Sequence, residues 1–90
     1  MIEEFESVWD ALEDDPIKAQ NLKLRSEIMM AVVAQIKQKK LTQEDAAQVL
    51  GVSQPRVSAL LNGKLDQFRI DMLIDFAHKL GLHVHFDIAA

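Results

Sequence analysis

The sequence predicts an all-α domain of about five helices that ends in a short C-terminal β-strand. Apolar residues recur every three or four positions over most of the chain, which is the helical period. Capping residues and glycines divide this pattern into short segments, and only the last residues alternate between apolar and polar. With 90 residues, 49% of them hydrophobic, the chain can form one domain around one core.

The composition excludes several classes of protein. There is no cysteine, which rules out a disulfide scaffold and any cysteine-based metal or redox site. No apolar run approaches the roughly 18 residues of a membrane span, and the acidic first residues do not resemble a signal peptide. We therefore expect a cytoplasmic protein without membrane contact. No glycine-rich phosphate loop or serine with an evident histidine base is present, so no enzyme activity, catalytic residue or cofactor is expected.

Charge is distributed unevenly along the chain. The formal net charge is −4, but residues 1–15 hold seven acidic residues and no basic one. The remaining residues hold the other seven acids and all ten bases, which leaves them at +3. Such asymmetry suggests two different partners or a masking segment. The alternative is a solvated acidic first helix.

The first half of the chain predicts two helices. Residues 4–12 form a short amphipathic one, and the second runs from Pro16 to about Gln38, with Asp15 as its N-cap and proline at its first position. The apolar stripe of the first helix is Phe5, Val8, Trp9 and Leu12, and that of the second is Leu24, Ile28, Val32 and Ile36, helped by Ile17 and Ala31.

Two short helices follow, joined by a tight turn. Thr42 caps the first, which Gly51 ends in a left-handed conformation. Ser53 caps the second, which runs from Gln54 to about Leu61 and ends at Asn62-Gly63. Small side chains at positions 46 and 47 allow the helices to cross closely. Two helices with a glycine turn between them have the geometry of a DNA-reading helix-turn-helix.

The C-terminal part predicts a loop over 64–69, a helix over 70–80 that ends at Gly81, and a strand over 82–88. A lone strand leaves its backbone groups unpaired, so we expect it to pair with the same strand of a second copy, which makes a homodimer. Its apolar face consists of Leu82, Val84, Phe86 and Ile88. The other face holds His83, His85 and Asp87, for which metal binding is conceivable, although solvent-facing side chains are the ordinary explanation and no metal site is predicted.

Residues 42–64, TQEDAAQVLGVSQPRVSALLNGK, resemble the Cro/C1-type (XRE) helix-turn-helix family of phage repressors and bacterial regulators. The resemblance rests on Thr-Gln at the start, alanine at the fifth position, Gly-Val-Ser at the turn and Asn-Gly after the second helix. It implies a lambda-repressor-like bundle. Residues 16–88 are similar to short antitoxins of the HigA type, although Arg69 stands where that family usually has a capping serine or threonine. Three parts follow: an acidic arm (1–15), a DNA-binding domain (16–81) and a dimerisation strand (82–90).

The resemblance also implies DNA contacts, because the second helix of the motif enters the major groove in this family. The expected base contacts, led by the arginine, are Gln54, Arg56, Ser58 and Ala59. The expected phosphate contacts are Gln43, Ser53, Asn62 and Lys64.

The function implied is sequence-specific repression at a palindromic operator on double-stranded DNA. Antitoxins of this type also neutralise a small basic RelE-like ribonuclease toxin and repress their own operon. The acidic arm could meet such a toxin through Phe5, Val8, Trp9 and Leu12, unless Trp9 packs on the helix over 16–38. The alternative is a stand-alone XRE-type regulator or phage-like repressor without a toxin partner.

Overall fold

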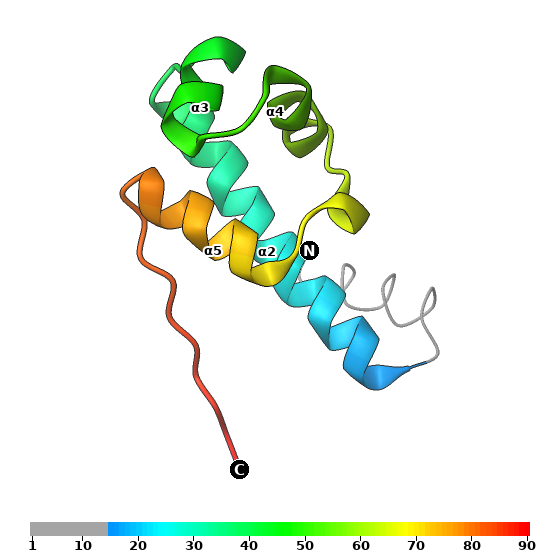
Figure 1. The fold of residues 1–90 in the computed structure, drawn as a ribbon. Helices are drawn as coiled ribbons and strands as arrows, with labels where there is room; N and C mark the ends of the chain where they lie inside the picture. Colours follow the sequence, from blue (N-terminus) through cyan, green and yellow to red (C-terminus); the bar gives the residue numbers. More distant parts are fainter. Residues whose placement is uncertain (1–14) are drawn as a thin grey trace.

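The computed structural model describes residues 15–90, which fold into four α-helices and one 3-10 turn (Figure 1). The predicted bounds of the four described helices agree with the observed ones to within one residue, and the segment 64–69, predicted as a loop, contains the 3-10 turn. The helix predicted over residues 4–12 lies outside the described residues. In chain order the elements are α2 (Pro16–Gln38), α3 (Gln43–Leu50), α4 (Gln54–Leu61), η1 (Leu65–Gln67) and α5 (Ile70–Lys79).

Helix α2 begins and ends through local chemistry. The Asp15 carboxylate accepts a hydrogen bond from the Ile17 amide at 2.9 Å, and Pro16 occupies the first helical position, both as predicted. At the other end, Lys40 adopts a left-handed conformation with φ of 55°. The Leu41 amide then reaches back to the Ile36 carbonyl at 3.1 Å, which closes the helix in the manner usually provided by glycine.

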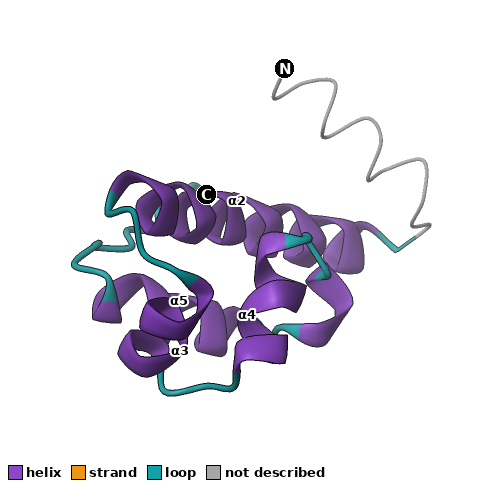
Figure 2. Cartoon of the chain, turned by 90° about the horizontal axis from the view of Figure 1, so that it is seen from above, coloured by secondary structure: helices purple, strands orange, loops and turns teal. Residues whose placement is uncertain are grey.

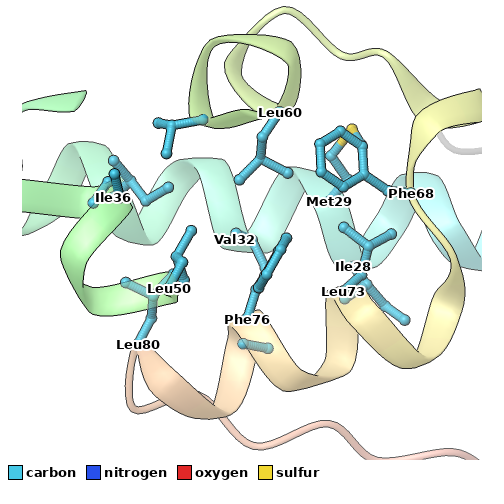
Figure 3. Packing of buried hydrophobic residues seen from close by; sticks show 14 residues of the cluster. Ile28, Met29, Val32, Ile36, Leu50, Leu60, Phe68, Leu73, Phe76 and Leu80 are labelled. Carbon is cyan, nitrogen blue, oxygen red and sulfur yellow. The ribbon is translucent and has the colours of Figure 1, made fainter. Parts of the chain in front are cut away.

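The core lies between α2 and the shorter helices (Figures 2 and 3). Ile28, Val32 and Ile36 of α2 are buried there as predicted. Ile17 and Ala31 are exposed instead. Ala31 lines an open hollow together with Ala77 of α5 and Leu82, and Ile17 lies in the first turn of α2, in the part of this helix that extends beyond the others (Figure 1). Helix α5 packs along α2 and buries Leu73, Phe76, Ala77 and Leu80, while α3 and α4 contribute Ala46, Leu50, Val57 and Leu60.

Three long polar side chains tie the ends of elements together. Lys79 of α5 donates to the Leu50 carbonyl at the end of α3, with an Nζ–O distance of 3.2 Å. Gln35 of α2 donates to the Leu80 carbonyl at 3.1 Å. Arg25 donates through Nη1 to the Leu65 and Phe68 carbonyls, which fixes η1 against α2. Carbonyls at the C-terminal end of a helix, such as those of Leu50 and Leu80, have no partner within that helix, so the bonds from Lys79 and Gln35 stabilise the arrangement of the elements.

Residues 82–90 have no regular secondary structure in the single chain. The strand predicted over 82–88 is therefore not confirmed, since a strand is defined by a ladder of hydrogen bonds to a partner and the described residues of one chain offer none. Leu82 and Val84 pack against the edge of the core. Phe86 is 50% exposed and Ile88 is 96% exposed. Pairing of this segment with a second copy stays a prediction.

Candidate DNA-binding surface

Helix α3 is fixed at its start by a reciprocal pair of hydrogen bonds. The Thr42 hydroxyl accepts from the Asp45 amide at 3.0 Å, and the Asp45 carboxylate accepts from the Thr42 amide at 3.4 Å. This is a capping box, with aspartate in the place usually held by glutamate or glutamine. Ala46 is fully buried on the inner face of α3, as its small size predicted.

The turn between α3 and α4 depends on Gly51, whose φ of 72° and ψ of 35° are left-handed. The amides of Gly51 and Val52 both reach the Ala47 carbonyl, at 2.8 and 3.0 Å. Ser53 then starts α4, and its hydroxyl accepts from the Arg56 amide at 3.3 Å. Capping at both helix starts and the left-handed glycine between them set the crossing of α3 and α4, as the sequence predicted.

Helix α4 presents its polar side to solvent. Val57 and Leu60 are fully buried against the core. Gln54 and Pro55 are exposed in the first turn, and Ser58 and Ala59 are half-buried one turn later. The side-chain amide of Asn62 donates through Nδ2 to the Ser58 hydroxyl at 3.4 Å. The side chains of Gln54 and Ser58 are therefore open to solvent on α4, as a contact with a base requires. Ala59 also packs in part against the core.

Arg56 occupies a different position from the one expected. Its guanidinium donates to the Gln67 carbonyl at 2.8 Å and to the Met72 sulfur at 3.2 Å. The same group lies over the ring of Phe68, with 4.5 Å between the guanidinium carbon and the ring centroid. A half-buried arginine with these contacts is directed toward η1 and α5 rather than outward. The sequence predicted that Arg56 reads a base; that role would require its side chain to leave the Gln67 carbonyl, the Met72 sulfur and the Phe68 ring.

The four expected phosphate contacts are all exposed; two lie at the starts of α3 and α4, and two lie at the end of α4. Gln43 is the first residue of α3, Ser53 and Asn62 cap the two ends of α4, and Lys64 follows in the loop. The Ser53 hydroxyl accepts one hydrogen bond within the chain and keeps its own proton to donate to a phosphate. Their placement fits a protein that lies along a DNA backbone.

Two further cations lie beside this surface. Lys39 and Lys40 are exposed in the connection between α2 and α3, directly before the Thr42 cap. Their positive charges at the C-terminal end of α2 also complement the dipole of that helix. The turn at Lys40 places them next to the start of α3, where DNA phosphates would be expected, so they join the candidate phosphate contacts.

Comparison with known proteins agrees with this geometry. A family described as a helix-turn-helix domain matches residues 11–89. A solved structure whose name places it among XRE family transcriptional regulators is 33% identical, with a TM-score of 0.76 over 81% of this chain and 82% of its own. This chain belongs to the XRE-type helix-turn-helix family. No curated protein matches the chain.

The metal site and the toxin contact that the sequence suggested for this XRE-type chain are not supported by the described residues 15–90. Residues 15–90 contain no group of three side chains that could hold a metal ion. His83 instead meets His78 edge to face, with ring centroids 6.0 Å apart. No helix within the same range is long and apolar enough to cross a membrane. The residues suggested for a toxin contact, Phe5, Val8, Trp9 and Leu12, lie outside the described range.

Proposed function

We propose that this chain is a DNA-binding transcriptional regulator that places α4 in the major groove of its operator. The observation that carries the proposal is the α3–turn–α4 unit, in which the cap at Thr42, the left-handed Gly51 and the cap at Ser53 set the crossing of the helices. In helix-turn-helix proteins this crossing lets the second helix enter the groove while the first crosses the backbone. A chain with this purpose needs no catalytic group.

The structure supports a base-reading set of modest size. Gln54 can pair with both hydrogen-bonding positions of an adenine edge, and the Ala59 methyl suits contact with a thymine methyl. Ser58 can donate or accept. Gln43, Ser53, Asn62 and Lys64 would contact phosphates, with Lys39 and Lys40 beside them. Because only three of these residues are cations, we expect the affinity to depend on salt with a moderate slope.

We propose that two copies bind together. The exposed side chains of Phe86 and Ile88 give residues 82–90 an apolar edge that a second copy could cover. Two recognition helices about one helical turn apart would then read a palindromic operator. A homodimer also doubles the small number of phosphate contacts that one copy offers.

At a finer level, we propose that the chain is an antitoxin that represses its own operon and neutralises a small basic RelE-like ribonuclease. The acidic composition of residues 1–15 supports this, because a ribonuclease that binds RNA carries a basic surface. The second candidate is a stand-alone XRE-type regulator, in which this acidic segment serves the fold alone.

A pull-down of the tagged chain from its native host, with both protein and DNA identified, tests the proposal. We expect the promoter of its own gene together with a small basic protein. The promoter without a protein partner would support the stand-alone regulator. Recovery of DNA fragments with no common sequence, after a wash at a salt concentration that removes weakly bound DNA, would contradict a sequence-specific function.

The role of Arg56 can be tested by comparing Arg56→Ala with Gln54→Ala. A lost base contact costs about 1–3 kcal/mol on the specific site only, and we expect this result for Gln54→Ala. We expect Arg56→Ala to weaken binding to the operator and to unrelated DNA by the same factor, because its contacts support the position of α4. The measurement is a titration of each variant with both duplexes. A loss confined to the operator would show that Arg56 reads a base.

A further inference from the structure

Two apolar surfaces of the chain are left uncovered within residues 15–90. The first lies on residues 82–90, the tail, where Phe86 is 50% exposed and Ile88 is 96% exposed. The second is an open groove of about 530 Å³ between α2 and the connection from α4 to η1. Exposed apolar patches that gather in one place commonly mark interaction sites.

The groove has a floor of core residues and walls of more exposed side chains. Met29 of α2 and Leu60 of α4 line it and are both buried. Met30, which is 58% exposed, stands on the α2 wall, and Leu61 stands on the α4 wall. Methionine fits its shape to different partners. Of the described residues that line the groove, Lys37 alone carries a charge.

The tail and the groove lie on different sides of α2 in one chain. Residues 82–85 of the tail border a separate hollow together with Glu27 and Ala31 of α2, whereas the groove lies on the side marked by Met30 and Lys37. One position along a helix turns the side chain by about 100°. Figure 1 shows that the tail leaves the end of α5 on the side away from η1. A tail that keeps these contacts is directed away from its own groove.

We propose that Phe86 and Ile88 of each copy occupy the groove of the other copy. This inference rests on the homodimer proposed above, and it names the surface that receives the tail. Exchange of the same contact in both directions closes a two-fold dimer. Each tail then meets a groove rather than the other tail, and both uncovered apolar surfaces become buried.

The free part of the tail is long enough for this contact. Leu82 and Val84 pack against the core of their own chain, so residues 85–90 can extend toward a second copy. Six extended residues cover about 20 Å, whereas the α2 wall from Met30 to Lys37 spans only about 10 Å at 1.5 Å per residue. Residues 86 and 88 point to the same side of an extended chain, so both side chains can enter the groove together.

The polar groups of the tail are compatible with this position. Because the groove is open on one side, the backbone of the tail keeps its contact with water, and no unpaired amide has to be buried. Asp87 points away from Phe86 and Ile88 in an extended chain, toward the rim of the groove. Neither Asp87 nor Lys37 forms an ion pair within residues 15–90. An exposed pair between them contributes little affinity but favours one direction of the tail.

Disulfide trapping tests the contact directly, because the chain contains no cysteine. Met30→Cys and Ile88→Cys are prepared as separate proteins and mixed under a mild oxidant. We expect a mixed disulfide-linked dimer as the main product. Val49→Cys is the matched control, since Val49 is 41% exposed on α3 and does not line the groove. Mixed with Ile88→Cys, it should give no such dimer.

Other products would overturn the proposal and show where the tail lies. Homodimers linked through Ile88→Cys, in place of the mixed dimer, would show that the two tails pair with each other. A disulfide within one chain of the double variant Met30→Cys/Ile88→Cys, in dilute protein, would show that the tail folds into its own groove. No mixed dimer, although light scattering finds a dimer, would place the interface elsewhere. A monomeric unaltered chain would overturn the homodimer as well, but not the DNA-binding function.

The dissociation constant of the dimer provides a second measurement. We expect Met30→Lys to raise it by about tenfold or more, because burial of an unpaired ammonium group in an apolar interface is costly. Val49→Lys should leave it unchanged, and both variants should keep the helical content of the unaltered chain by circular dichroism. A dissociation constant that Met30→Lys does not change would show that the groove is not part of the interface.

Discussion

Replacing Phe68 with alanine is expected to lower the free energy of unfolding by about 3–5 kcal/mol, which is the usual cost of removing a buried phenylalanine. Phe68 is 1% exposed and packs edge to face on Phe76, with ring centroids 6.1 Å apart. Its ring also supports the Arg56 guanidinium. Since small domains are stable by only about 5–15 kcal/mol, this variant should be close to unfolding at moderate temperature.

Urea unfolding at a fixed protein concentration measures this effect, because dimerisation would make stability depend on concentration. Val49→Ala serves as the control, since its exposed side chain should change stability by no more than about 0.5 kcal/mol. A loss below about 1 kcal/mol for Phe68→Ala would be smaller than surveys of buried phenylalanines allow and would contradict the central position of Phe68 in the core.

The second large effect is expected at the C-terminus. Phe86→Asp combined with Ile88→Asp should yield monomers by light scattering and weaken binding to the palindromic operator by about 10²–10⁴-fold, because linked half-sites bind with an avidity of this size. Both side chains are exposed in the single chain, so the fold itself should survive. Truncation after Gly81 should have the same effect, but it also removes Leu82 and Val84, which pack on the core.

A duplex that carries only one half-site provides the control for this prediction. Binding of one copy to one half-site does not use the dimer contact, so the double variant and the unaltered chain should bind it equally. Dimers that persist in the double variant would show that the two copies meet through another surface. Equal weakening on the half-site and the palindrome would show that residues 82–90 affect the DNA-binding unit itself.

The helix boundaries could be predicted because they depend on neighbours in the chain. Asp15, Thr42 and Ser53 each accept a hydrogen bond from an amide two or three positions later, and Gly51 takes the left-handed conformation that glycine favours. Such interactions require no knowledge of the tertiary fold. The candidate phosphate contacts came from the family resemblance rather than from such local interactions, and their contact with DNA stays a prediction.

Features that depend on distant parts of the chain could not be predicted in this way. The direction of Arg56 depends on Gln67, Phe68 and Met72, which follow it by 11 to 16 positions. The role of Arg25 depends on carbonyls 40 or more positions away. Lys40 is a different case, because the pattern of left-handed helix ends favours glycine or asparagine and gives no signal for lysine.

The hydrogen bond from Lys79 to the Leu50 carbonyl connects helix α5 with the end of helix α3. Helix α5 leads directly into residues 82–90, and through Lys79 it also holds the end of α3. A dimer formed through residues 82–90 would thus carry its two reading helices on a stiff frame rather than on linkers. Such a frame tolerates little change in operator spacing: an inserted base pair would rotate one half-site out of reach, even with both half-site sequences intact.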